Sequence, residues 1–132
     1  MNTRRNARAR VFVVEDSALI RKRIIDDLVS TGRFEIVGVA EAQPDAIASI
    51  SKLCPDIVTT DIQLKEGSGI EVVRQVRANP NCPPPRIFVL TNYAHPEYQR
   101  KCLSSGADDF FDKTSDYARF LVAMEQASQA TA

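Results

Sequence analysis

Short runs of apolar and β-branched residues alternate along this chain with longer segments whose apolar residues recur every three or four positions. The first four runs are nearly continuous, which is typical of strands covered on both faces of a sheet. We predict five strands, at residues 11–14, 36–40, 57–60, 87–90 and 109–111.

The segments between these runs have the spacing of helices. Ile20, Ile24 and Leu28 recur every fourth residue after Ser17, a candidate N-cap, and Gly32 is a candidate stop. The alternation of strand and helix predicts a parallel sheet with helices on both faces, joined by right-handed crossovers. Further helices are predicted over 45–53, from Ile70 past Val76, over 96–106, and from Phe120 toward Ala127.

The length and composition fit one domain with a substantial core, since the chain has 132 residues of which 44% are hydrophobic. We place this domain at residues 10–128, between a flexible basic arm at 1–9 and a short tail at 129–132. The first ten residues are rich in arginine: Arg4, Arg5, Arg8 and Arg10.

Charge and cysteine content narrow the class of protein. Lys+Arg equals Asp+Glu at 17 each, so nothing global predicts binding to nucleic acid or a membrane. No apolar run approaches the roughly 20 residues of a membrane span. Cys54, Cys82 and Cys102 form no CxxC or Cys/His cluster, so we expect neither a zinc site nor a disulfide framework. Three unpaired thiols would fit a cytoplasmic location.

Polar side chains stand at four of the five predicted strand ends. Glu15 and Asp16 end the first strand, Asp61 the third and Thr91 the fourth, and Lys113 closely follows the fifth. Ligands of open parallel sheets bind at the carboxyl ends of the strands, so these groups should converge. Carboxylates packed together need a counter-charge, and Mg²⁺ is the usual cation where phosphate is handled. Each residue alone is more often a helix cap, a strand end or a surface charge, but their joint occurrence at the strand ends predicts a functional site.

These segments resemble the receiver domains of two-component response regulators, in particular single-domain regulators of the chemotaxis type. The resemblance covers almost the whole chain and implies a flavodoxin-like (βα)5 fold with strand order 2-1-3-4-5. It also implies a cytoplasmic, phosphorylated switch rather than an enzyme with a separate substrate. Its motifs lie at Val13–Ser17, Pro55–Leu64 with Gly67 and Gly69, Val89–Thr91 and Gly106–Lys113.

The resemblance assigns roles to individual residues. Asp61 would accept the phosphoryl group from a phosphohistidine of a sensor histidine kinase or a phosphotransfer protein. Glu15, Asp16 and Asp61 would hold Mg²⁺ together with the backbone carbonyl of Gln63. Lys113 would pair with Asp61 and then with the phosphoryl group.

Two further residues would pass the signal on. Thr91 would bond to the phosphoryl group, and the aromatic Phe110 would turn inward in response. Output to a protein partner would use the face of the fourth helix, fifth strand and fifth helix, which could also pair two copies as a homodimer. This face includes Tyr98, Lys101, Phe110 and Asp116.

Other functions remain open. The chain could be the receiver part of a DNA-binding transcriptional regulator, or a pseudo-receiver that only binds partners. A Mg²⁺ phosphatase with an aspartyl intermediate would carry a second acid two residues after the nucleophile, where this chain has Gln63.

Overall fold

Strands and helices alternate along the part of the chain that the computed structural model describes, residues 7–131. None of the described helices is long and apolar enough to cross a membrane. The strands are β1 Ala9–Val14, β2 Phe34–Ala40, β3 Ile57–Thr60, β4 Arg86–Thr91 and β5 Asp109–Asp112. The helices are α1 Ala18–Val29, α2 Gln43–Leu53, α3 Gly69–Ala78, α4 Pro96–Ser105 and α5 Tyr117–Thr131.

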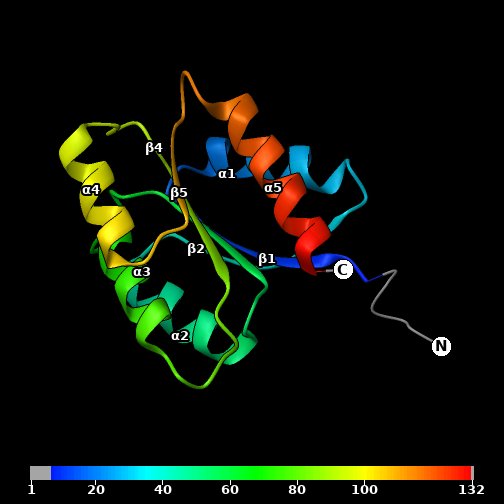
Figure 1. Cartoon of the computed structure of the whole chain (residues 1–132), viewed down its shortest axis with the longest axis horizontal. Helices are drawn as coiled ribbons and strands as arrows, with labels where there is room; N and C mark the ends of the chain where they lie inside the picture. Colours follow the sequence, from blue (N-terminus) through cyan, green and yellow to red (C-terminus); the bar gives the residue numbers. More distant parts are fainter. Residues whose placement is uncertain (1–6, 132) are drawn as a thin grey trace.

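The five strands form one sheet in the order β2-β1-β3-β4-β5, and every strand pair is parallel. This confirms the predicted doubly wound (βα)5 fold and its strand order. The order reverses between β1 and β3, which start crossovers on opposite sides of the sheet. Helices α1 and α5 cover one face, and α2, α3 and α4 cover the other (Figure 1). The carboxyl ends of β1 and β3 therefore lie side by side at the switch point where such folds bind ligands.

Two separate apolar clusters lie on the two faces of the sheet, because successive side chains of a strand point in opposite directions. Phe110 packs on the face covered by α2, α3 and α4, whereas Phe111 packs on the face covered by α1 and α5. The last four residues of β1, Val11 to Val14, are each at most 1% exposed. The nearly continuous apolar runs of the sequence are thus explained by burial on both faces.

The first strand and the last helix extend slightly beyond residues 10–128, where we predicted the domain. Ala9 already belongs to β1, and α5 continues to Thr131 through most of the segment that we predicted as a tail. Ala127 and Ser128 are buried, and alanine favours the helix, so α5 has reason to continue. Of the basic arm predicted at 1–9, residues 1–6 lie outside the described residues, and Ala9 lies within β1.

The prediction of three unpaired thiols is wrong for two of them. Cys54 and Cys82 form a disulfide, with their Cα atoms 5.4 Å apart. They are 28 residues apart in sequence, and folding alone brings them together. Cys102 is a free, buried thiol.

Candidate functional site

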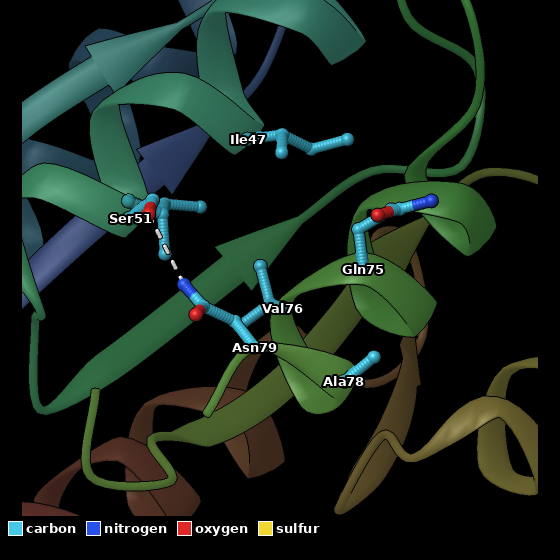
Figure 2. Close-up of a pocket in the computed structure, with 7 residues that line it drawn as sticks. Ile47, Ser51, Gln75, Val76, Ala78 and Asn79 are labelled. Carbon is cyan, nitrogen blue, oxygen red and sulfur yellow. Dashed lines mark hydrogen bonds between the residues drawn. The ribbon is translucent and has the colours of Figure 1, made fainter. Parts of the chain in front are cut away.

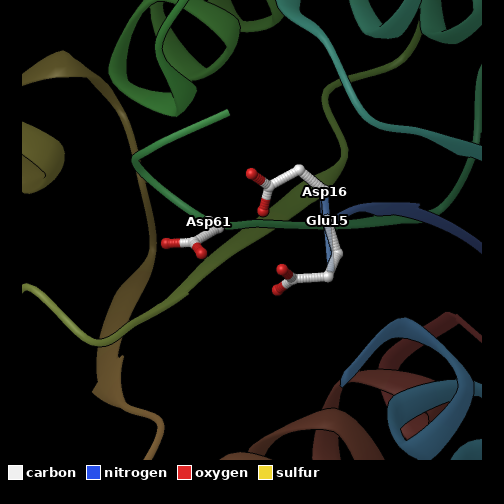
Figure 3. Close-up of side chains that lie close together, drawn as sticks. All are labelled: Glu15, Asp16 and Asp61. Carbon is white, nitrogen blue, oxygen red and sulfur yellow. The ribbon is translucent and has the colours of Figure 1, made fainter. Parts of the chain in front are cut away.

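Three carboxylates meet at the carboxyl edge of the sheet. Glu15 and Asp16 directly follow β1, and Asp61 directly follows β3 (Figure 3). One carboxylate oxygen from each residue lies within 4.8 Å of the others. Oxygen ligands in such a group suit a hard divalent cation such as Mg²⁺. The structure thus brings together the acidic residues that the sequence predicted.

Lys113 supplies a positive charge to this cluster. Its Nζ lies 2.7 Å from Asp61 Oδ2 and 2.8 Å from Glu15 Oε1. The side chains of Lys113 and Asp61 are each 8% exposed, and that of Glu15 is 2% exposed. Buried charges persist when they are paired and hydrogen-bonded. The ammonium contacts two of the three carboxylates, and Asp16 lies beside them, so the carboxylates outnumber the one cation and a metal ion could balance the difference.

Burial and pairing act in opposite directions on the titration of these groups. Burial raises the pKa of Glu15, and the hydrogen bond and charge of Lys113 only partly oppose this. Burial also disfavours the charged form of Lys113, but its bonds to Asp61 and Glu15 outweigh that effect and raise the pKa of the ammonium group. Lys113 therefore remains positively charged at neutral pH.

The backbone around Asp61 fixes the orientation of its carboxylate. Asp61 Oδ1 accepts a 2.6 Å hydrogen bond from the backbone N–H of Ile62, while Oδ2 faces Lys113. Gly69, the first residue of α3, donates its N–H to the carbonyl of Ile62 at 2.7 Å. A Cβ at Gly69 would overlap the carbonyl oxygen of Asp61, so only glycine permits this approach of α3.

The start of α1 shapes the other side of the cluster. Ser17 caps α1, since its hydroxyl accepts a hydrogen bond from Ile20 N, as the sequence predicted. The backbone N–H of Ser17 donates to Glu15 Oε2 at 3.1 Å. The turn between β1 and α1 thereby holds the Glu15 carboxylate toward Lys113, while the Asp16 carboxylate stays exposed.

The remaining predicted residues surround this centre with different degrees of contact. Thr91 is buried at the end of β4, and its hydroxyl oxygen accepts a hydrogen bond from Tyr93 N at 3.0 Å rather than contacting Asp61. Phe110 is 4% exposed and already lies in the core. Gln63 has an exposed side chain and forms an isolated bridge with Ser68 in the loop after Asp61.

The carboxyl end of β2 also contributes a charged residue, one that was not among the predicted site residues. Glu41 follows β2, and its Oε2 lies 3.1 Å from Arg21 Nη1, which also donates to the Glu15 carbonyl at 2.7 Å. The Glu41 backbone carbonyl accepts a hydrogen bond from Lys65 N, in the loop after Asp61. Glu41 directly follows Ala40, the last residue of β2, so it has the same position at a strand end as Glu15 and Asp61.

Comparison with known proteins gives one consistent result. Residues 11–125 match the model of the response regulator receiver domain. The chain is 36% identical over 121 residues to a protein-glutamate methylesterase/protein-glutamine glutaminase of Nocardioides sp., covering 92% of this chain but only 33% of that protein. It is 28% identical to the chemotaxis protein CheY of Thermotoga maritima, covering 91% of this chain and 98% of CheY.

Solved structures agree with this result. The response regulator domain of Thermotoga maritima CheB superimposes with a TM-score of 0.83 at 25% identity, covering 93% of this chain and 98% of that domain. The chain spans about a third of the length of the methylesterase relatives but nearly all of this isolated domain. The geometry of the carboxylates and Lys113 and the family match lead to one conclusion: the chain belongs to the response regulator receiver domains of two-component signalling.

Proposed function

We propose that this domain is a signalling switch that accepts a phosphoryl group on Asp61. The observation that carries the proposal is the buried Asp61 carboxylate, held by Lys113 Nζ at 2.7 Å and by Ile62 N at 2.6 Å beside two more carboxylates. An aspartate carboxylate is ionised at neutral pH, so it can attack phosphorus without a general base. Phosphoryl transfer then depends mainly on positioning and on neutralising the phosphoryl oxygens.

We propose Mg²⁺ as the cofactor, with Glu15, Asp16, Asp61 and the backbone carbonyl of Gln63 as its protein ligands. The three carboxylates fit this role because their oxygens lie within 4.8 Å of one another and outnumber the single ammonium of Lys113. When bound, Mg²⁺ would neutralise charge on the phosphoryl oxygens during transfer. Asp16 is the exposed member of the group, which suits the entry of an ion from solvent.

Lys113 and Thr91 would hold the transferred group. The ammonium of Lys113 already contacts the Asp61 oxygen and can bond to a phosphoryl oxygen attached there. The Thr91 hydroxyl would leave the Tyr93 amide, 3.0 Å away, and donate to the phosphoryl group. The backbone N–H of Tyr93 would then lose its acceptor, so the loop between β4 and α4 would change with it.

The signal would leave through the face formed by α4, β5 and α5. Phe110 lies in the cluster that also contains Cys102 of α4, so it links β5 to α4. Asp116 Oδ2 accepts the N–H of Asp112 at 3.0 Å and joins β5 to the start of α5. Tyr98 and Lys101 lie exposed on α4 and would contact the partner.

We propose a sensor histidine kinase or a phosphotransfer protein as the source of the phosphoryl group, and a protein as the downstream target. The domain would work in the cytoplasm and would have no separate substrate of its own. Two copies could associate through the same α4–β5–α5 face.

A second candidate is the same switch acting on an effector segment of a longer protein. The methylesterase relative, of which the chain covers 33%, favours this arrangement. The Thermotoga maritima CheY, of which it covers 98%, favours a separate partner protein. That the receiver controls a DNA-binding segment, as part of a transcriptional regulator, also stays a prediction.

Intact-protein mass after incubation with acetyl phosphate tests the proposal. The wild type should gain one phosphoryl group only when Mg²⁺ is present, and Asp61→Asn should gain none. Asp45→Asn, an exposed carboxylate on α2, is the matched control and should behave as the wild type. No gain with or without Mg²⁺ would make the domain a pseudo-receiver and refute the roles given above.

A further inference from the structure

A disulfide joins two loops at the edge of the sheet opposite the carboxylates. Cys54 ends α2 with a left-handed backbone (φ 45°), three residues before β3, and Cys82 lies in the loop between α3 and β4. Because β3 and β4 are parallel, their amino ends share this edge, whereas Asp61 and Thr91 lie at the other edge. The bridge therefore belongs to no part of the site described above.

The bridge lies next to a place where α2 and α3 are not fully packed. A hollow of about 270 Å³ lies between the ends of the two helices, with Ile47 and Ser51 on one side and Gln75 and Asn79 on the other (Figure 2). Asn79 Nδ2 donates to Ser51 Oγ at 3.1 Å across it. The Cys82 sulfur also lies 3.4 Å from the Ser51 carbonyl oxygen, but the disulfide is the one covalent link between the end of α2 and the loop after α3 among the described residues, so losing it would loosen that connection.

The surroundings of Cys82 leave its sulfur within reach of small molecules. The loop at 79–85 holds four of the seven prolines of the chain, so it cannot be absorbed into a helix or strand. Cys54 and Cys82 are both partly buried, but the neighbours of Cys82, Asn81 and Pro83, are exposed, whereas Pro55 beside Cys54 is buried. Cys102, in contrast, is 0% exposed, and burial raises the pKa of its thiol to about 11. Thiol chemistry is thus confined to the Cys54–Cys82 pair.

We propose that Cys54 and Cys82 form a thiol–disulfide exchange site whose co-reactants are low-molecular-weight thiols and disulfides of the glutathione class. In oxidation, the Cys82 thiolate attacks one sulfur of the small disulfide, which forms a mixed disulfide and releases one small thiolate. The Cys54 thiolate then attacks the Cys82 sulfur, closes the bridge and releases the second small thiolate. Two protein thiols are oxidised, one small disulfide is reduced to two thiols, and the two protons pass to the released thiolates.

The redox state of this pair sets how firmly the end of α2 and the loop after α3 are held. Closing a 28-residue separation restricts the unfolded chain, and the expected rise in Tm is on the order of 10 °C for a domain of 132 residues. Disulfides in reducing compartments are usually transient or redox-sensing, so a reversible bridge fits a domain that works there.

The test equilibrates the native wild type in buffers with graded ratios of reduced to oxidised glutathione. Thiols are then blocked with N-ethylmaleimide, and intact mass and Tm are measured. We expect two thiols to appear together as the ratio rises and Tm to fall by roughly 10 °C. Cys82→Ser should show the lower Tm at every ratio. A pair that opens only in denaturant, a pair that stays reduced in oxidised glutathione, or equal Tm values in both states would overturn the proposal.

Single-cysteine variants test the order of attack. With oxidised glutathione, Cys54→Ser should gain one glutathionyl group on Cys82 several times faster than Cys82→Ser gains one on Cys54. Equal rates would overturn the assignment of the first attack to Cys82. Neither measurement involves Asp61 or Mg²⁺, so both remain informative whatever the result of the phosphorylation experiment.

Discussion

Replacing Gly69 by alanine should disturb the phosphorylation site through the backbone alone. Gly69 begins α3, and an added Cβ would overlap the carbonyl oxygen of Asp61 and lie 2.8 Å from its carbonyl carbon. The hydroxyl oxygen of Thr60 would lie 2.9 Å away. Contacts under 3.0 Å essentially never occur for a real Cβ, so either α3 or Asp61 has to move.

The size of the effect follows from what has to move. The nearest atoms are backbone, which cannot rotate away, so the cost should reach the upper end of ordinary overpacking, about 3 kcal/mol. A displacement of about 1 Å at a reacting group can reduce the rate on the order of 100-fold. We therefore expect Gly69→Ala to lower the free energy of unfolding by about 3 kcal/mol. Phosphoryl uptake by the folded variant should be roughly 100 times slower.

Urea unfolding and the initial rate of uptake from acetyl phosphate measure these two effects. Gly32→Ala is the matched control, because Gly32 has a φ of +75° and nothing within 4 Å of an added Cβ. Because alanine is strained at a left-handed position, the free energy of unfolding of Gly32→Ala should fall by about 1 kcal/mol, while its rate of phosphoryl uptake should equal that of the wild type. Wild-type stability and rate in Gly69→Ala would refute the steric reasoning. Lost stability with an unchanged rate would show that the position of Asp61 does not depend on α3.

Three further predictions concern charged and hydrogen-bonded groups. Lys113→Ala leaves Glu15 and Asp61 buried without their cation, so the free energy of unfolding in urea at pH 7 should fall by about 3–5 kcal/mol. Mg²⁺ should restore part of this loss, and a variant as stable as the wild type would contradict the prediction. Burial raises the pKa of Glu15, so the folded state binds this proton more tightly than the unfolded state does. Without Mg²⁺, the free energy of unfolding of the wild type should therefore fall relative to that of Glu15→Gln as pH rises from about 4.5 through the raised pKa. A difference between the two proteins that does not change with pH would contradict this prediction. Tyr117 Oη donates to Asp27 Oδ2 at 2.6 Å and joins α5 to α1. Tyr117→Phe should therefore lower the free energy of unfolding by about 1–2 kcal/mol and lower Tm. An unchanged Tm would mean that water replaces the bond.

The sequence predicted the elements well where one local pattern decides the structure. The apolar runs located all five strands, and Ser17 correctly marked the start of α1. The convergence of Glu15, Asp16, Asp61 and Lys113 was also predictable, because parallel strands bring their carboxyl ends to one edge.

Other features depend on distances that no local pattern encodes. The approach of Cys54 to Cys82 requires Cα atoms about 5–6 Å apart, which a separation of 28 residues does not reveal. The hydrogen bond of Thr91 to the Tyr93 amide depends on a side-chain rotation. The double contact of Lys113 with Glu15 and Asp61 likewise depends on how the loop after β5 returns to the sheet.

Phe110 and Phe111 of β5 point to opposite faces of the sheet, and the backbone of the sheet separates the interior into two apolar clusters. Side chains on one side of the sheet contact α2, α3 and α4, and those on the other contact α1 and α5. Helices on opposite faces of the sheet belong to different apolar clusters, so the energetic effects of substitutions on α3 and α1 should be close to additive. Sequence change among the helices of one face can therefore proceed with little compensation on the other, which lets α2, α3 and α4 vary while α1 keeps its packing.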